Sequence, residues 1–314
     1  MKKRLLVLAL IVNSAISGFA QETNLYTFFL NIVNENFRFP LIGLVNIAQG
    51  NHSTLQLGLI NWNTGDFSTL QTGVINTVRG DLSGGQLGVI NTVNGNINGW
   101  QLGTINTGQT LQGAQIGVIN TAGSGGQGLQ LGVINTSFER LQGVQFGVIN
   151  FADSIEDGIP IGVISIVRQG GYRAVEFSLT EFHLINVGLK LGVERFYSTL
   201  IVGYDPTGDF SQRSFAAGVG FGTIIHINNS FFINPQLNTL NTIGRNGSHL
   251  LSFVPNFGFN VSENISITLA PSLTWAYNFS SREVQQPAFS IFRHNINSSN
   301  DIVIGARAGI RFRF

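Results

Sequence analysis

The last segment of the chain alternates apolar and polar side chains at every second residue. Since successive residues of a strand point to opposite sides, this pattern predicts a strand with two different faces. Its opposite face carries three arginines, which are costly to expose to lipid, so we expect them to point into a polar lumen or to lie near a membrane interface. The strand is long enough to cross a bilayer. The apolar face consists of Ile302, Ile304, Ala306, Ala308, Ile310, Phe312 and Phe314, and the other face of Val303, Gly305, Arg307, Gly309, Arg311 and Arg313.

The same alternation recurs through the C-terminal half and predicts an antiparallel β-barrel of about eight strands. Short and long connections alternate between the strands, as they do in transmembrane barrels. A water-soluble barrel would show the same alternation, with its apolar faces turned inward. We favour the membrane barrel because the chain also carries an export signal, lacks cysteine and ends in phenylalanine. The expected strands lie near residues 174–182, 184–193, 195–205, 213–227, 231–242, 249–261, 264–278 and 301–314.

The first half contains a different pattern, a Gln-Leu-Gly-Val-Ile-Asn motif that returns about every fifteen residues. A repeat this regular predicts one structural unit stacked on itself, here a β-solenoid of about nine coils. The best-formed copy runs from Gln86 to Trp100, and a degenerate last copy has Ser165 in place of asparagine. The repeated asparagines are Asn46, Asn61, Asn76, Asn91, Asn106, Asn120, Asn135 and Asn150.

Three expectations about each coil follow from the motif. Each coil contributes a strand to a parallel sheet, and the asparagine and glutamine side chains stack in columns of hydrogen-bonded amides. The isoleucine before each asparagine is buried together with its apolar neighbour if the chain bends there, and asparagine tolerates the left-handed backbone of such a bend. The recurring glycine, as at Gly88 and Gly103, marks a close approach of another backbone or a tight corner.

A rival interpretation makes each repeat one membrane-spanning strand. The repeats and the C-terminal strands would then form one larger barrel of about sixteen strands with an aqueous pore. The apolar alternation within a repeat covers only about three positions, which is short for a lipid-facing band. We therefore favour the solenoid.

The N-terminus and the composition set the location and the domain boundaries. Residues 1–20 form a secretory signal peptide, with Lys2, Lys3 and Arg4 before a short apolar run. We divide the remainder into a lead-in at 21–40, the repeats at 41–167 and the barrel at 172–314. The net charge of +1 and the 11% content of charged residues give no signature of nucleic-acid binding. The absence of cysteine excludes disulfides.

Two resemblances follow from these residues. Residues 172–314, with the terminal Arg-Phe-Arg-Phe, resemble small eight-stranded outer-membrane barrels of the outer-membrane protein A kind. The Gln-x-Gly-x-Ile-Asn repeats resemble short surface repeats of spirochaete and Bacteroidetes-like outer-membrane proteins. The resemblances imply an outer-membrane location in a Gram-negative-type envelope, and a terminal Phe314 read by the barrel-insertion machinery. They imply no established activity.

The sequence offers little catalytic chemistry. The five histidines, at positions 52, 183, 226, 249 and 294, show no metal-ligand spacing, and we expect them in exposed loops or at interfaces. We expect no metal, no cofactor and no enzyme activity. Glu176 on the first barrel strand should face Arg307 and Arg311 on the last strand, because an unpaired charge in the lumen would be costly.

The resulting hypothesis is a non-enzymatic structural or interaction protein of the outer membrane. The barrel contacts lipid, and the repeats bind an envelope partner, either a protein or a polysaccharide. The larger-barrel channel is the alternative. A third hypothesis is that Asn-Thr columns, such as Asn76-Thr77 and Asn91-Thr92, bind ice or polysaccharide. We favour it less, because columns of this type also arise from packing at corners.

Overall fold

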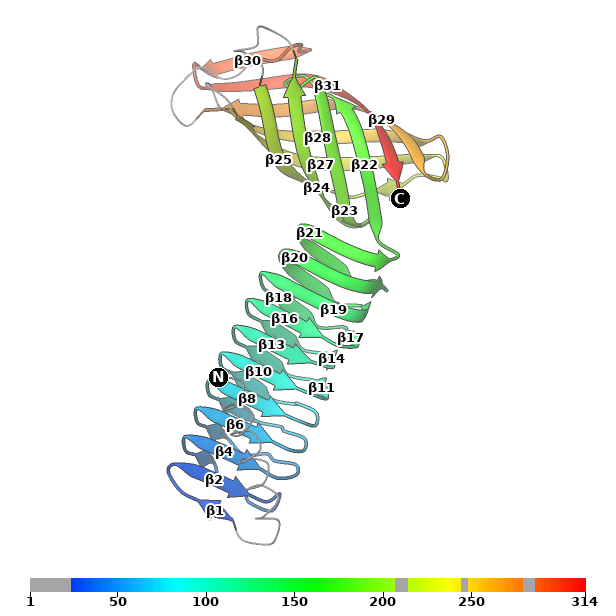
Figure 1. The fold of residues 1–314 in the computed structure, drawn as a ribbon. Helices are drawn as coiled ribbons and strands as arrows, with labels where there is room; N and C mark the ends of the chain where they lie inside the picture. Colours follow the sequence, from blue (N-terminus) through cyan, green and yellow to red (C-terminus); the bar gives the residue numbers. More distant parts are fainter. Residues whose placement is uncertain (1–23, 207–213, 244–247, 279–285) are drawn as a thin grey trace, which may run out of the picture. The chain divides into compact units, whose positions relative to one another are not determined.

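The computed structural model describes residues 24–206, 214–243, 248–278 and 286–314. It divides into two compact units, Met1–Val118 and Ile119–Phe314, which we describe separately. All regular elements are β-strands, so the all-β prediction is confirmed: a solenoid of stacked coils is followed by a closed barrel (Figure 1). Among the described residues, no helix is long and apolar enough to span a membrane.

The first unit is built of stacked coils whose strands pair in parallel and in register. Ile75 to Val78 pair with Ile90 to Val93, so equivalent residues of successive repeats are direct neighbours. Each coil contributes two or three short strands rather than the single strand expected from the motif. The strands are β1 Leu25–Tyr26, β2 Leu30–Val33, β3 Leu41–Ile42, β4 Val45–Ala48, β5 Gln56–Leu57, β6 Ile60–Asn63, β7 Leu70–Thr72, β8 Ile75–Val78, β9 Gly85–Leu87, β10 Ile90–Val93, β11 Asn96–Ile97, β12 Trp100–Leu102, β13 Ile105–Gly108, β14 Thr110–Leu111 and β15 Ala114–Ile116.

The solenoid begins earlier than the motif indicates. Within the lead-in at 21–40, strand β2 pairs in parallel with β4, and Asn31 lies beside Asn46. The side-chain amide of Asn31 donates a 2.7 Å hydrogen bond to Asn46 Oδ1. The lead-in therefore contains a coil of its own, although it lacks the Gln-x-Gly part of the motif.

The second unit continues the same coil design and then forms the barrel. Its coil strands lengthen toward the end of the repeats: β16 Ile119–Ala122, β17 Gly125–Gly126, β18 Leu129–Leu131, β19 Ile134–Leu141, β20 Val144–Ile155 and β21 Ile159–Gln169. The barrel strands are β22 Tyr172–Leu179, β23 Ile185–Val193, β24 Phe196–Asp205, β25 Ser214–Gly222, β27 Phe231–Ile243, β28 His249–Asn260, β29 Ile265–Tyr277 and β31 Asn300–Arg313, with the short β26 Ile225–His226 and β30 Phe292–Asn297 beside them.

The barrel closes through antiparallel pairing of its first and last strands. Strand β22 pairs with β31, and each of the other six long strands pairs with its two sequence neighbours. The eight strands thus form a complete barrel without the repeats. The alternative of one sixteen-stranded barrel is wrong, because the repeats pair in parallel with one another in a separate sheet.

The two faces of the barrel strands follow the sequence alternation. Along β29, Ile267, Leu269, Leu273 and Trp275 are exposed, whereas the alternate residues Thr268, Ala270, Ser272 and Thr274 are buried. Along β31, Arg307 and Arg311 are buried, and Ile304 and Ile310 are exposed. The apolar faces therefore turn outward and the polar faces line the interior.

Candidate functional site

Two columns of buried amides form the centre of the solenoid. Asn61 Nδ2 donates a 2.8 Å hydrogen bond to Asn76 Oδ1, and Asn76 Nδ2 donates a 2.9 Å bond to Asn91 Oδ1. Gln86 Nε2 donates in the opposite direction along the chain, to Gln71 Oε1 at 2.8 Å. These side chains are fully buried. The two columns therefore donate along the solenoid in opposite senses.

The remaining asparagines of the motif occupy the same position in their coils. Asn91 donates to Asn106 Oδ1, Asn120 to Asn135 Oδ1, and Asn135 to Asn150 Oδ1, each at 2.9 Å. Each asparagine also donates to a backbone carbonyl of the next coil; for Asn91 this is Leu102 O at 3.0 Å. Because the Asn columns face inward, they offer no amide to an outside ligand. The asparagine half of the predicted Asn-Thr columns is therefore wrong as a binding surface, whereas the threonine half, at Thr77 and Thr92, is partly exposed.

The bend of the motif lies at the glycine and not at the asparagine. Asn91 belongs to strand β10, and Asp157 is the one non-glycine residue with a positive φ among the described residues. A Cβ on Gly88 would lie 2.5 Å from Gly73 O, and a Cβ on Gly103 would lie 2.4 Å from Gly88 O. These glycines thus permit the close backbone approach that the motif predicts, since no side chain fits there.

The apolar residues of the motif face outward, which contradicts the expected burial of the isoleucine. Ile75 is 37% exposed and Ile90 is 37% exposed, while the preceding Val74 and Val89 are 45% and 47% exposed. The two columns of hydrogen-bonded amides, which we call the amide ladder, explain why these residues point outward. Successive side chains of a strand point to opposite faces, so the neighbours of the inward Gln and Asn must face solvent. The interior is completed by a third column of apolar side chains, Phe67, Leu82, Ile97 and Leu111.

Inside the barrel, the carboxylate of Glu176 is surrounded by three cationic side chains. Arg311 Nε donates a 2.7 Å hydrogen bond to Glu176 Oε2, and Arg307 Nη2 lies 2.5 Å from Oε1. Lys190 Nζ lies 3.7 Å from Oε2. Glu176 and Lys190 are fully buried, and the two arginines nearly so. A carboxylate on the first strand therefore ties together the first, second and last strands.

Neutral side chains extend this cluster across the lumen. Asn234 Oδ1 accepts hydrogen bonds from Arg311 Nη2 at 2.6 Å, from Tyr197 OH at 2.8 Å and from Gln236 Nε2 at 2.9 Å. Lys190 lies 5.0 Å from the centre of the Tyr197 ring. Lys190 was not among the predicted lumen charges, although its place on the alternating inward face of 185–193 was a usable signal.

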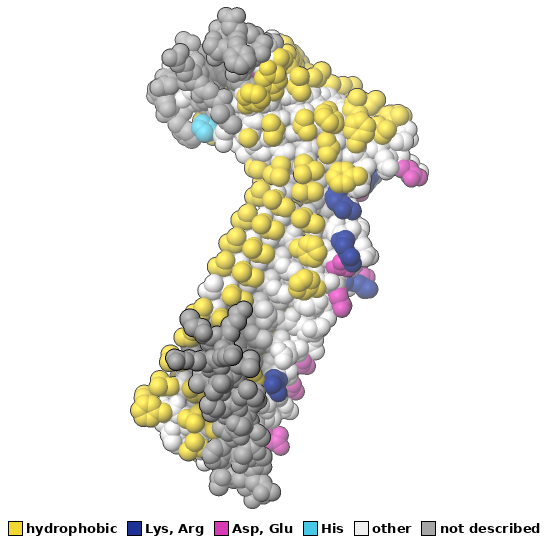
Figure 2. Space-filling model, in the orientation of Figure 1, with side chains coloured by type: hydrophobic (Ala, Val, Ile, Leu, Met, Phe, Trp, Pro, Cys, Tyr) yellow, Lys and Arg dark blue, Asp and Glu magenta, His cyan; other side chains and the backbone are white. Residues whose placement is uncertain are grey.

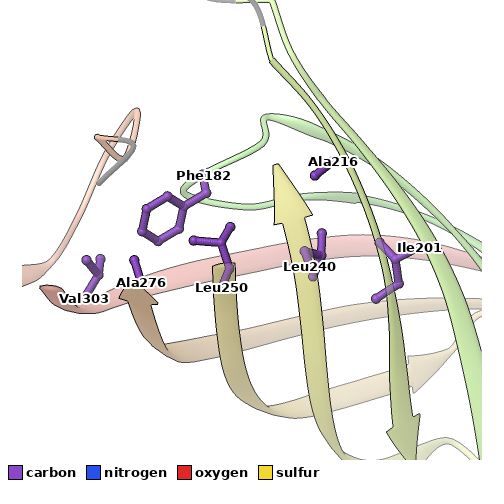
Figure 3. Close-up of a cluster of buried hydrophobic side chains, with 7 residues drawn as sticks. All are labelled: Phe182, Ile201, Ala216, Leu240, Leu250, Ala276 and Val303. Atoms are coloured by element: carbon purple, nitrogen blue, oxygen red, sulfur yellow. The ribbon is translucent and has the colours of Figure 1, made fainter. Parts of the chain in front are cut away.

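Residues 180–184, predicted to belong mainly to the ends of two strands, instead form a connection at the loop end of the barrel. Phe182, between β22 and β23, packs inside the barrel against inward apolar side chains of six strands (Figure 3). Its neighbours Glu181 and His183 are buried as well, and Thr274 Oγ1 donates a 2.8 Å hydrogen bond to Glu181 Oε1. The cluster comprises Phe182, Ile201, Ala216, Leu240, Leu250, Ala276 and Val303.

Two histidines depart from the expected exposed positions. His52 is buried in the solenoid interior, where its Nε2 lies 2.7 Å from Thr54 Oγ1. Burial lowers the pKa of His183 to about 4, against a smaller opposing effect of Asp205. His226 remains partly exposed beside Glu194, at 3.0 Å. Within the described residues, no group of three His, Asp or Glu side chains could hold a metal ion.

A small cavity lies in the lumen. Its volume is about 40 Å³, and it is lined by Phe182 and by polar groups that include Glu181, Ser272 and Arg307. That volume accommodates only a few water molecules at most. Phe314, at the end of the chain, is 67% exposed, and its N–H donates to Arg173 O at 3.3 Å.

Comparison with solved structures gives a structural likeness. The crystal structure of Neisserial surface protein A (NspA) aligns with 46% of this chain and 97% of its own, at 11% sequence identity and a TM-score of 0.27. No protein-family model matches the chain. No curated protein matches it by sequence.

Proposed function

We propose that the chain is a non-enzymatic structural protein of an outer membrane, in which the barrel is the lipid anchor and the solenoid is an extended interaction surface. The observation that carries the proposal is the distribution of side chains in the barrel, which is the reverse of that in a water-soluble barrel. Apolar side chains lie on the outside, and a buried ionic cluster lies on the inside. Leu269, Leu273 and Phe257 are 50–60% exposed, which water would disfavour and lipid would not.

Aromatic side chains support a membrane of ordinary thickness around the barrel. Phe231 and Phe259 pack together toward one end, and Trp275 and Tyr277 toward the other. Phe259 lies opposite Ile267, ten residues before Tyr277 on β29. Ten residues span about 34 Å of strand and, at a tilt of about 40°, about 25 Å of membrane depth, which matches the lipid-facing band of such barrels.

The interior argues for an anchor and against an open channel. Glu176, Lys190 and Asn234 are completely buried, so water does not reach them at this depth of the lumen. The Phe182 segment fills the barrel beyond them. An eight-stranded barrel is wide enough only for side chains. We therefore expect no stable large conductance in planar bilayers.

The connection lengths suggest which side the repeats occupy. The connections on the side where the barrel begins and ends are residues 194–195, 223–230 and 261–264. Those on the other side are residues 180–184, 206–213, 244–248 and 278–299, the last of which is the longest. In outer-membrane barrels the short turns face the periplasm. On this basis the repeats extend into the periplasm, where they would meet an envelope partner.

Protease treatment of intact cells tests this topology. One epitope tag is inserted within residues 121–128 of the repeats and another within 283–298 of the barrel. The proposal expects cleavage of the second tag and protection of the first, and cleavage of both once the outer membrane is permeabilised. Cleavage of the first tag in intact cells would place the repeats outside and reverse the topology.

A further inference from the structure

The corner of each coil beside the amide columns carries aliphatic side chains that contact solvent. We call this row the aliphatic ridge. It lies where the chain turns between consecutive strands of a coil, for example between β9 and β10. In the first unit its exposed members are Ile42, Leu44, Leu59, Ile60, Val74, Ile75, Leu87, Val89, Ile90, Leu102, Ile116 and Val118, each 37–53% exposed. The coils of the second unit repeat it with Ile119, Leu131, Val133, Phe146, Val148 and Ile149.

The ridge carries no charge, and the charged side chains of the repeats lie elsewhere on the coils. Figure 2 shows hydrophobic side chains along one edge of the coils and charged ones along the other. Asp66 and Asp81 accept hydrogen bonds from backbone N–H groups of the following coils, at 2.8 and 2.7 Å. Protein surfaces that bind to the surface of a membrane carry Lys and Arg beside their apolar residues. The ridge has no Lys or Arg beside its apolar residues, which favours a protein partner.

The ridge of the first unit alone is large enough for a stable interface. Its aliphatic side chains expose on the order of 1,000 Å², more than the few hundred Å² that monomers usually expose in one patch. A standard protein interface buries about 800 Å² on each partner. Covering the ridge would therefore give a stable contact without help from the rest of the molecule.

The spacing of the ridge restricts the shape of its partner. In-register pairing places equivalent side chains, such as Val74 and Val89, about 4.8 Å apart. A partner that interdigitates over several coils must present the same spacing along a straight line, as stacked β-strands do. A second copy of this chain presents the same ridge with the same spacing.

We infer that the aliphatic ridge pairs two copies of this chain, side by side and parallel, about a two-fold axis that runs along the solenoid. The parallel direction rests on the proposed function, because barrels inserted in one membrane with one topology hold their repeats in the same direction. Each coil of one copy then meets the same coil of the other, so that Val89 lies near the partner's Val89.

Cysteine cross-linking tests this pairing in the full-length protein, which contains no native cysteine. Single variants Leu59→Cys, Val89→Cys and Val118→Cys sample three coils of the ridge. Asn94→Cys and Asn98→Cys are matched controls at exposed polar positions of the coil that contains Val89. After mild oxidation of native membranes, all three ridge variants should form a disulfide-linked dimer, and both controls should stay monomeric.

Three results would overturn the inference. Cross-linking at only one of the three ridge positions indicates an antiparallel pair. Rapid labelling of all three by a water-soluble maleimide, without dimer, indicates a ridge exposed to water. Protection from maleimide without dimer, together with quenching of a ridge-attached fluorophore by brominated lipid, indicates a ridge covered by membrane.

A charge placed on the ridge gives a second, independent test. In the Leu59→Cys background, Val89→Lys should reduce the dimer yield at least tenfold, whereas Val89→Ile should leave it unchanged. An unaltered yield with Val89→Lys contradicts the inference. A failure of the proposed membrane anchor would be distinguished from a failure of the pairing. In that case the protein, without any cross-link, would be released from membranes in the absence of detergent.

Discussion

Glu176 and Arg311 lie directly opposite each other across the seam between the first and last barrel strands, and Arg311 Nε donates a 2.7 Å hydrogen bond to Glu176 Oε2. Residues 135 positions apart in the chain thus meet only when the barrel closes. Because Lys190 and Arg307 also contact this carboxylate, Glu176 supplies one negative charge that three cationic side chains share.

Replacing Glu176 by alanine should strongly destabilise the barrel. The substitution leaves three cationic side chains buried without their shared anion, and breaking a buried pair in this way costs about 3–5 kcal/mol. We expect a clear drop in the unfolding temperature in detergent, followed by circular dichroism. Glu263→Ala, at an exposed turn, is the control and should leave the temperature unchanged. Equal temperatures for the Glu176 variant and the wild type would remove the ion pair from the account of stability.

Asn91→Ala tests the amide ladder. The variant removes a donor to Asn106 and Leu102, and it leaves one of the two N–H groups of the Asn76 amide without its acceptor, while the other still donates to Leu87 O. A buried unpaired polar group costs about 1–3 kcal/mol, so the solenoid should lose that much or more. Val89→Ala, two residues away on the exposed ridge, should cost much less. Hydrogen exchange of the neighbouring coils measures both, and equal effects of the two variants would show that the ladder adds nothing to stability.

Gly88→Ala tests the close approach of successive coils. The added Cβ would lie 2.5 Å from Gly73 O and 2.5 Å from the Asn76 amide nitrogen, so one coil must move away from the next. We expect faster proteolysis within the repeats, with the heat-induced mobility shift of the barrel retained. Ser83→Ala, at an exposed position, should behave as the wild type. Normal protease resistance of the Gly88 variant would contradict the observed packing.

His183 should make the barrel less stable in acid. Burial lowers its pKa to about 4, below the value of 6.5 of an unperturbed histidine. The unfolded chain therefore binds more protons between pH 6.5 and 4, and stability must fall as the pH falls through that window. The slope is at most about 1.4 kcal/mol per pH unit for one group. His183→Gln should flatten the dependence of the unfolding temperature on pH in this window. An unchanged slope would show that other groups cause the pH dependence.

The barrel could be predicted from the sequence because the alternation of apolar and polar residues lies within each single strand. In β31, Arg307 and Arg311 alternate with apolar residues on a strand of fixed period, so their inward direction follows from the pattern alone. The stacking of repeats was predictable for the same reason, since Asn76 and Asn91 are related by a constant step.

The remaining features depend on contacts that a single-residue pattern does not contain. The outward direction of Ile90 follows from the inward ladder of Asn91, which outweighs the burial of an isoleucine. The first coil at Asn31 lacks half of the motif. The inward fold of Phe182 depends on side chains of six strands that are distant in the sequence. Such features follow only from the folded structure, in which residues distant in the sequence are in contact.

The fluorescence of Trp275 gives the most direct test of lipid contact. Trp62→Phe and Trp100→Phe together leave Trp275 as the sole tryptophan of the chain, on the outward face of β29 and 45% exposed. In vesicles of brominated phospholipid, its emission should be quenched, more strongly by bromines near the head groups than by those at the bilayer centre. Unquenched emission from a chain that stays in buffer without detergent would contradict a barrel that faces lipid.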